Sequence, residues 1–177
     1  MMTLNKDISE LTELAIKAAI KAGKEILGVY YSNDFGVELK ADNSPLTIAD
    51  KKAHNVIVEI LSQTKIPILS EEGKAISFEQ RKNWDLFWLV DPLDGTKEFV
   101  KRNDEFTVNI ALIENNSPIA GVVYVPVTRV LYWANKNGSF KAAVDDENEL
   151  LNDTTAVANN FGKGQFCSCW KQFAHEP

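Results

Sequence analysis

The residues of this chain that are best suited to chemistry lie in one short run, residues 91–96, which reads Asp-Pro-Leu-Asp-Gly-Thr. Asp91 and Asp94 supply two carboxylates, and Thr96 supplies a hydroxyl close to them. Oxygen ligands gathered in this way suit a hard divalent cation such as Mg2+. The free backbone amides at the start of a helix would suit a phosphate group. The run therefore predicts a site that binds a metal ion and a phosphate.

The sequence on either side of this run indicates which elements hold it in place. Four apolar residues, 87–90, come directly before it and are typical of a buried strand. Because proline cannot donate to a sheet ladder, we expect this strand to end at Asp91. Gly95 permits backbone angles that are closed to other residues, and Thr96 is a favoured N-cap, so we expect a helix to start near Lys97.

Length and charge limit the class of protein. The chain has 177 residues, which is enough for one domain with a sizeable core and short for two. Its net charge of -6 argues against general affinity for nucleic acid or anionic membranes, and an acidic protein that handles phosphates usually needs a cation between itself and the substrate. No apolar run approaches the roughly 20 residues of a membrane span, and residues 1–7 are too polar for a signal peptide, which favours a cytoplasmic protein. The oligomeric state stays open.

The C-terminal part has a different character from the rest. Residues 145–149 are acidic, and residues 152–177 show no sustained period, so we expect a domain over 1–144 and an irregular tail over 145–177. Cys167 and Cys169 are too close in sequence to favour a disulfide, in keeping with a reducing compartment. With His175 they make three possible ligands, which falls short of a four-ligand zinc site.

Helical and strand periodicities place the N-terminal elements. Apolar residues recur at helical spacing over 8–30, residues 36–40 alternate as a strand does, and the turn-prone residues 41–45 predict a hairpin or tight loop. A second helix is expected near Thr47, with Asp50 in its first turn, where a negative charge meets the positive end of the helix dipole. The residues of this helix that we expect to face the core are Ile48, Val56, Ile57, Ile60 and Leu61.

The remaining segments predict strands. Residues 66–69 form a short apolar run that ends in acids, so two neighbouring strands are expected to bring Glu71 and Asp91 to the same edge of a sheet. The segments 105–113, 119–127 and 130–134 are separated by turns and predict an antiparallel meander.

Three motifs, in this order, resemble the inositol monophosphatase superfamily of Mg2+-dependent, lithium-sensitive phosphatases: residues 47–50, 70–73 and 91–96. The continuation over 97–112 resembles the 3'(2'),5'-bisphosphate nucleotidase branch, whereas inositol monophosphatases proper usually continue with Thr-Asn-Phe. The resemblance covers residue 8 to about residue 141. It implies a layered α+β sugar-phosphatase-like fold, with two long helices and a mainly antiparallel sheet.

The resemblance also implies a ligand set for the metal ions, of which the complete family site holds two or three. Glu71, Asp91 and the backbone carbonyl of Leu93 are implied for one Mg2+, and Asp91 with Asp94 for a second. Glu71 is favoured over Glu72 because the family uses the first acid of this pair.

Catalytic roles follow from the same resemblance. The Thr96 hydroxyl is implied to pair with Asp50 and to orient and deprotonate the attacking water. The amides of Gly95 and Thr96 are implied to hold the substrate phosphate.

The implied activity is the conversion of 3'-phosphoadenosine 5'-phosphate to AMP and phosphate. The family has a second half, with a further Asp ligand, for which this sequence shows no match, so we expect the chain to correspond to the N-terminal portion. An inositol monophosphatase or fructose bisphosphatase-like enzyme and a non-catalytic fragment stay open as alternatives. A haloacid dehalogenase-type phosphatase fits less well, because its two acids are separated by one residue, whereas two residues separate Asp91 from Asp94.

Overall fold

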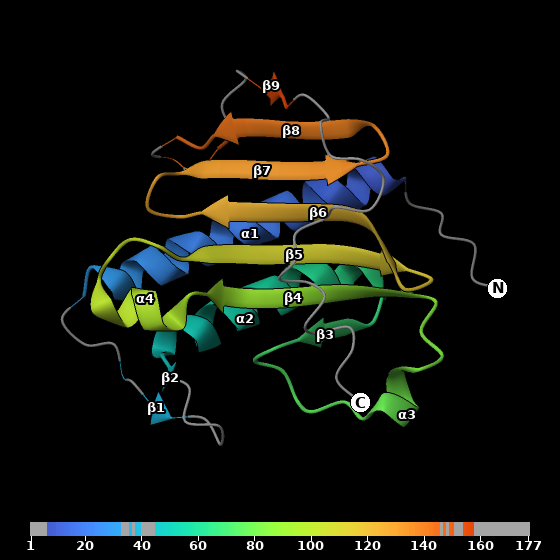
Figure 1. The fold of residues 1–177 in the computed structure, drawn as a ribbon, viewed down its shortest axis with the longest axis horizontal. Helices are drawn as coiled ribbons and strands as arrows, with labels where there is room; N and C mark the ends of the chain where they lie inside the picture. The colour runs from blue at the N-terminus through green and yellow to red at the C-terminus, as the bar shows by residue number, and fades with distance from the viewer. Residues whose placement is uncertain are drawn as a thin grey trace.

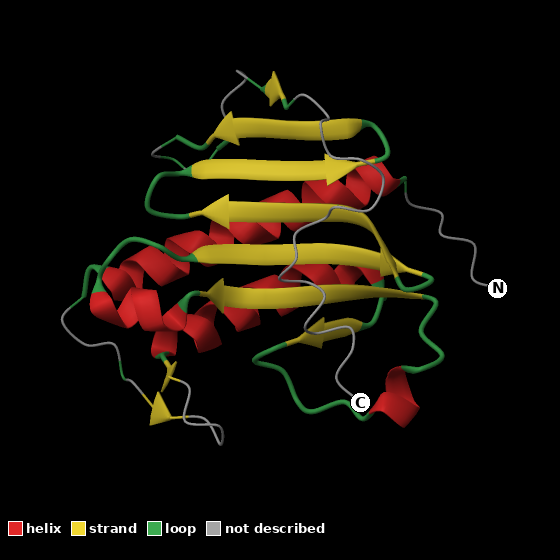
Figure 2. Cartoon of the chain, viewed as in Figure 1, coloured by secondary structure: helices red, strands yellow, loops and turns green. Residues whose placement is uncertain are grey.

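In the computed structural model, two long helices lie against one face of a sheet that has seven strands among the described residues (Figures 1 and 2). The structure describes residues 7–32, 36, 38–39, 45–145, 147, 149–150 and 154–157. The helices are α1 (Ile8–Tyr30) and α2 (Ile48–Leu61). In spatial order the strands are β3 (Ile68–Ser70), β4 (Leu86–Asp94), β5 (Thr107–Glu114), β6 (Ser117–Val125), β7 (Val130–Asn135), β8 (Gly138–Ala143) and β9 (Thr155–Ala156). β3 and β4 pair in parallel and the other neighbours are antiparallel, so the predicted layered α+β fold is confirmed.

The first helix has the predicted bounds, and its apolar stripe packs on the sheet. Asp7 caps it by accepting a hydrogen bond from the Ser9 amide, which satisfies one of the free donors of the first turn. Gly23 lies against β6, because a Cβ built on it would be 2.4 Å from the ring of Tyr124. The absence of a side chain at Gly23 therefore makes room for this ring.

We expect Gly23→Ala to lower the free energy of unfolding by about 1–3 kcal/mol, the usual cost of overpacking a core. The ring of Tyr124 cannot give way easily, since only 1% of this residue is exposed. Gly28→Ala, on the same helix, is the matched control: no atom lies within 4 Å of the added Cβ, and better helix propensity should add roughly 0.5–1 kcal/mol. Urea unfolding of the two variants measures the difference, and equal shifts would contradict the assigned contact.

The second helix begins with a capping box. Thr47 accepts from the amides of Ala49 and Asp50, and the Asp50 carboxylate accepts from the Thr47 amide. The prediction that Ile48 faces the core is wrong, because 39% of this residue is exposed. Ile48 is off the buried stripe that begins at Ala49, and its side chain lies over Gly36 instead.

The strand that carries the acidic motif is longer than predicted. The sequence predicts an end at Asp91, but β4 continues through Pro92 to Asp94. Asp91 pairs with Asn109 and Asp94 with Thr107, so three steps along β4 match two along β5. The one extra residue is a bulge, which accommodates a proline that has no amide to donate.

The helix after the motif, α4 (Thr96–Lys101), starts one residue earlier than expected. Its N-cap is Gly95, in the left-handed conformation at φ 95°, so the prediction that Thr96 is the N-cap is wrong. A Cβ on Gly95 would lie 2.7 Å from the carbonyl oxygen of Glu105, which leaves room only for glycine. Thr96 is therefore the first helical residue, and its hydroxyl is available for another contact.

The remaining elements are short or form the meander. β5 to β8 form an antiparallel meander, as predicted, with β8 as a strand that the sequence did not reveal. β1 (Glu38–Leu39) and β2 (Pro45–Leu46) form a separate antiparallel pair, and the predicted turn between them lies outside the described residues. The short helices are η1 (Ser62–Thr64) and α3 (Phe78–Arg81). The described part of the chain has no helix long and apolar enough to cross a membrane.

Candidate active site

Two neighbouring strands bring acids to one edge of the sheet. In the parallel pair, Ser70 of β3 is opposite Val90 of β4, and the Glu71 amide donates to the Val90 carbonyl at 3.0 Å. Glu71 therefore follows the carboxyl end of β3, and Asp91 lies beside it in β4, three residues before that strand ends. This is the edge where ligands bind in many α/β proteins.

Asp91 is in an environment that disfavours its own charge. Burial, followed by the charges of Glu71 and Asp94, raises the pKa of Asp91 to about 8, and a hydrogen bond with Glu71 adds to the shift. Its Oδ1 atom is buried and has no hydrogen-bond partner. A buried acceptor without a partner, next to two further acids, fits a divalent cation as the missing partner.

Asp94 is exposed, and its carboxylate is directed to a neighbouring strand. Its Oδ2 accepts a hydrogen bond from Asn109 Nδ2 at 3.0 Å. Within the described ranges, no three acidic, His or Cys side chains are arranged so that they could already hold a metal ion. Since like charges repel, the three acids gain nothing by converging unless a cation lies between them. Their donor chemistry and the unpartnered Oδ1 of Asp91 fit Mg2+.

A second group of residues joins α2 to α4. Asp50 is fully buried, and its Oδ2 accepts from the Thr47 amide at 2.8 Å and from the Thr47 hydroxyl. Its Oδ1 accepts from the Thr96 hydroxyl at 3.1 Å, and that hydroxyl also lies 3.2 Å from the Leu93 carbonyl. Burial raises the pKa of Asp50, while the hydrogen bonds from Thr47 and Thr96 act in the opposite direction. Of the predicted site residues, Asp50, Leu93 and Thr96 are thus in direct contact.

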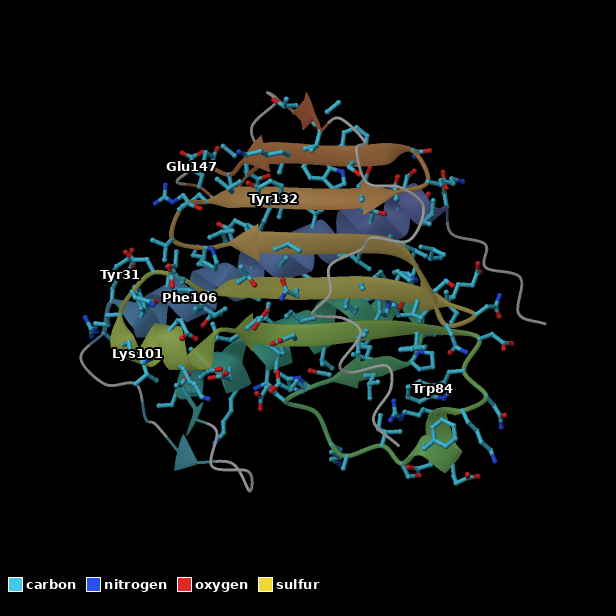
Figure 3. All side chains as sticks on the ribbon, in the orientation of Figure 1. Tyr31, Trp84, Lys101, Phe106, Tyr132 and Glu147 are labelled. Carbon is cyan, nitrogen blue, oxygen red and sulfur yellow. The ribbon has the colours of Figure 1, made fainter. Side chains whose placement is uncertain are left out.

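An aromatic cluster fixes the helix that carries Thr96. Phe99 of α4 is fully buried, and its ring centroid lies 5.1 Å from that of Tyr30 and 5.3 Å from that of Phe106. The Tyr30 hydroxyl donates to Asp104 at 2.7 Å, which ties the end of α1 to the loop before β5. In Figure 3 the labels of Lys101 and Phe106 mark this end of the sheet. The helix that begins with Thr96 is therefore anchored to the core by its aromatic contacts.

The sequence did not single out several residues at this edge. An open pocket of about 340 Å³ is lined by Glu71 and Asp91 and also by two basic residues, Lys74 and Arg81. The Nε atom of Arg81 is buried and has no hydrogen-bond partner. The sequence also did not single out Asn109 as a site residue. It could have been noticed as a polar residue in the otherwise apolar run of β5, a strand that is buried on both faces.

Comparison with known proteins assigns the chain to a family. Residues 7–164 match the inositol monophosphatase family. The chain belongs to this family. The crystal structure of CysQ from Bacteroides thetaiotaomicron, described as a bacterial member of the inositol monophosphatase family, has 42% sequence identity and a TM-score of 0.73, over 94% of this chain and 67% of that one.

Curated proteins are similar over much of the chain. The 3'(2'),5'-bisphosphate nucleotidase CysQ of Haemophilus influenzae is 40% identical over 158 residues, which are 88% of this chain and 57% of the relative. The protein of the same name from Escherichia coli K12 is 52% identical over 126 residues, which are 70% of this chain and 51% of the relative. The chain thus spans about half the length of the curated relatives it matches, and its resemblance to the CysQ type is confirmed.

Proposed function

We propose that this chain carries the metal-binding and water-orienting part of a Mg2+-dependent phosphomonoester hydrolase, which converts 3'-phosphoadenosine 5'-phosphate to AMP and phosphate. The observation that carries the proposal is the contact between Asp50 and the Thr96 hydroxyl at 3.1 Å, made beside the acid-rich edge of the sheet. It joins a hydroxyl at a helix start to a fully buried carboxylate from a different helix.

Mg2+ is the cofactor that we assign to the acidic edge. Glu71, Asp91 and the Leu93 carbonyl are the proposed ligands of one ion, and Asp91 with Asp94 of a second. When bound there, Mg2+ would lower the pKa of a water molecule and neutralise charge on the leaving oxygen. The unpartnered buried Oδ1 of Asp91 supports this assignment.

Thr96 and Asp50 are the proposed catalytic residues. The Thr96 hydroxyl lies within hydrogen-bond distance of two acceptors, Asp50 Oδ1 and the Leu93 carbonyl. Whichever of them takes its single proton, the oxygen of Thr96 can still accept a hydrogen bond from a water molecule. Thr47 donates to the other oxygen of Asp50, which fixes the position of the carboxylate. The amides of Gly95 and Thr96 are assigned to the substrate phosphate. Positioning of this kind supplies much of the rate in phosphoryl transfer.

The substrate assignment rests on the relatives and on the charge of the pocket. The curated relatives from Haemophilus influenzae and Escherichia coli carry the name 3'(2'),5'-bisphosphate nucleotidase. Lys74 and Arg81 line the same pocket as Glu71 and Asp91, which suits a ligand with more than one phosphate. An inositol monophosphate has only one phosphate and is the second candidate, because solved inositol monophosphatases share the fold.

Phosphate release from 3'-phosphoadenosine 5'-phosphate and from inositol monophosphate tests the proposal. We expect turnover of the nucleotide to exceed that of inositol monophosphate, to require Mg2+ and to fall when Li+ is added. Turnover that persists in EDTA, or a preference for inositol monophosphate, would contradict it.

The length of the chain supplies a further control. The same assay is run on a version extended by the second half found in the relatives. If only the extended version turns over substrate while both bind Mg2+, the 177-residue chain is a metal-binding fragment without catalysis.

A further inference from the structure

Asn109 lies between the two acids of the β4 bulge. It is directly opposite Asp91 in the register of β4 and β5, and its side-chain amide donates to Asp94 at 3.0 Å. Only 5% of Asn109 is exposed, although the carboxylate that it contacts belongs to an exposed residue. A buried amide is thus directed outward, to one of the proposed metal ligands.

Thr107 fixes which end of the Asn109 amide faces Asp94. The Thr107 hydroxyl donates to Asn109 Oδ1 at 3.1 Å. Because this bond occupies the oxygen end of the amide, the nitrogen end is turned to Asp94 Oδ2. The three side chains form a directed chain of hydrogen bonds that starts at the hydroxyl and ends at the carboxylate.

We propose that Asn109 is a positioning residue, oriented by Thr107, that holds the Asp94 carboxylate in place for Mg2+. This inference rests on the proposed function, because it takes Asp94 as a ligand. A donor that holds one oxygen of a ligating carboxylate leaves the other free and removes rotamer freedom before the ion arrives.

A purely structural role of Asn109 predicts a different outcome. If Asn109 only satisfied buried groups, its loss would lower the stability of the fold and leave Mg2+ affinity unchanged. Leucine has nearly the volume of asparagine, and both former partners are at least partly exposed, so water can replace the lost bonds. We therefore expect Asn109→Leu to melt near the temperature of the unaltered chain when no metal is present.

The test is a Mg2+ titration by calorimetry, together with the melting temperature with and without Mg2+. Asn109→Leu should weaken Mg2+ binding roughly tenfold or more, as is usual when a partner of a metal ligand is removed. Thr107→Val should give a smaller loss, and Thr107→Ser, which keeps the hydroxyl, should restore affinity. Adding Thr107→Val to Asn109→Leu should weaken binding no further than Asn109→Leu alone, since Thr107 acts through the amide.

Asn135→Leu is the matched control. Asn135 also donates to a threonine hydroxyl, that of Thr12 at 3.1 Å, but it lies on β7, away from the acids. We expect Mg2+ affinity to be unchanged in this variant. Unaltered Mg2+ binding by Asn109→Leu, or an equal loss in Asn135→Leu, would overturn the positioning role alone. Absence of saturable Mg2+ binding by the unaltered chain would overturn the proposed metal site, and this role with it.

Discussion

Asp91→Asn should abolish the response of this chain to Mg2+ and, in metal-free buffer, make the chain more stable. Asp91 is the carboxylate that the proposed site uses for both ions, so its loss should lower Mg2+ affinity more than about 100-fold, beyond the usual effect of a supporting residue. Phosphate release should fall with it. The gain in stability follows from the cost of keeping a third acid beside Glu71 and Asp94 in a buried position.

The stability gain has a pH dependence whose sign is fixed by the pKa of Asp91. This pKa is about 8 in the folded chain, whereas an unfolded aspartate titrates near 4. Between these values the folded state holds one more proton than the unfolded state, so the metal-free chain loses up to about 1.4 kcal/mol per pH unit as pH rises. Asp91→Asn removes this loss. The difference in free energy of unfolding between the variant and the unaltered chain, both without metal, should therefore grow from pH 4 to pH 8.

Chemical unfolding across this pH range, with and without Mg2+, measures both effects. Asp85→Asn is the control, since Asp85 is an exposed acid just before the same strand. It should change neither the pH dependence nor the response to Mg2+. An Asp91→Asn chain that Mg2+ still stabilises would remove Asp91 from the ligand set, and a chain that is less stable at pH 8 would contradict the account of its charge.

The elements that the sequence predicts well are those whose signal is local. The first helix shows a periodic apolar stripe over its whole length, and the structure has the predicted bounds. The order of the three acidic motifs was enough to point to the family, which the comparisons confirm. The contact of Asp50 with Thr96 joins residues 46 positions apart and was implied only by the resemblance.

The errors arise where one strand or helix depends on another. Pro92 is expected from sequence to end β4, but a bulge against β5 accommodates it, and only the pairing partner reveals this. Thr96 has the residue type of an N-cap, yet the N-cap is Gly95, because the carbonyl oxygen of Glu105 leaves no room for a side chain there. Asn109 was passed over because its role depends on the side chain opposite, which the sequence of β5 alone does not contain.

Thr96→Val should lower turnover far more than it lowers Mg2+ affinity. The substitution keeps the size and branching of the side chain but removes the hydroxyl that the buried Asp50 holds. Loss of a group that positions a proton in the transition state costs typically about 100-fold to 10,000-fold in rate. None of the proposed ligand atoms is removed, although the hydroxyl lies beside the Leu93 carbonyl, so calorimetric Mg2+ affinity should fall by no more than the roughly 10-fold to 100-fold that follows loss of a partner of a metal ligand.

The same substitution leaves Asp50 Oδ1 without its donor, which separates the chemical effect from a structural one. A buried acceptor without a partner costs about 1–3 kcal/mol of folding stability, and the pKa of Asp50 should rise further because the Thr96 bond opposes its increase. Thr96→Ser keeps the hydroxyl and should recover most of the rate and stability. Equal losses of rate and Mg2+ affinity in Thr96→Val would place Thr96 in the metal site, whereas full activity would exclude it from orienting the water.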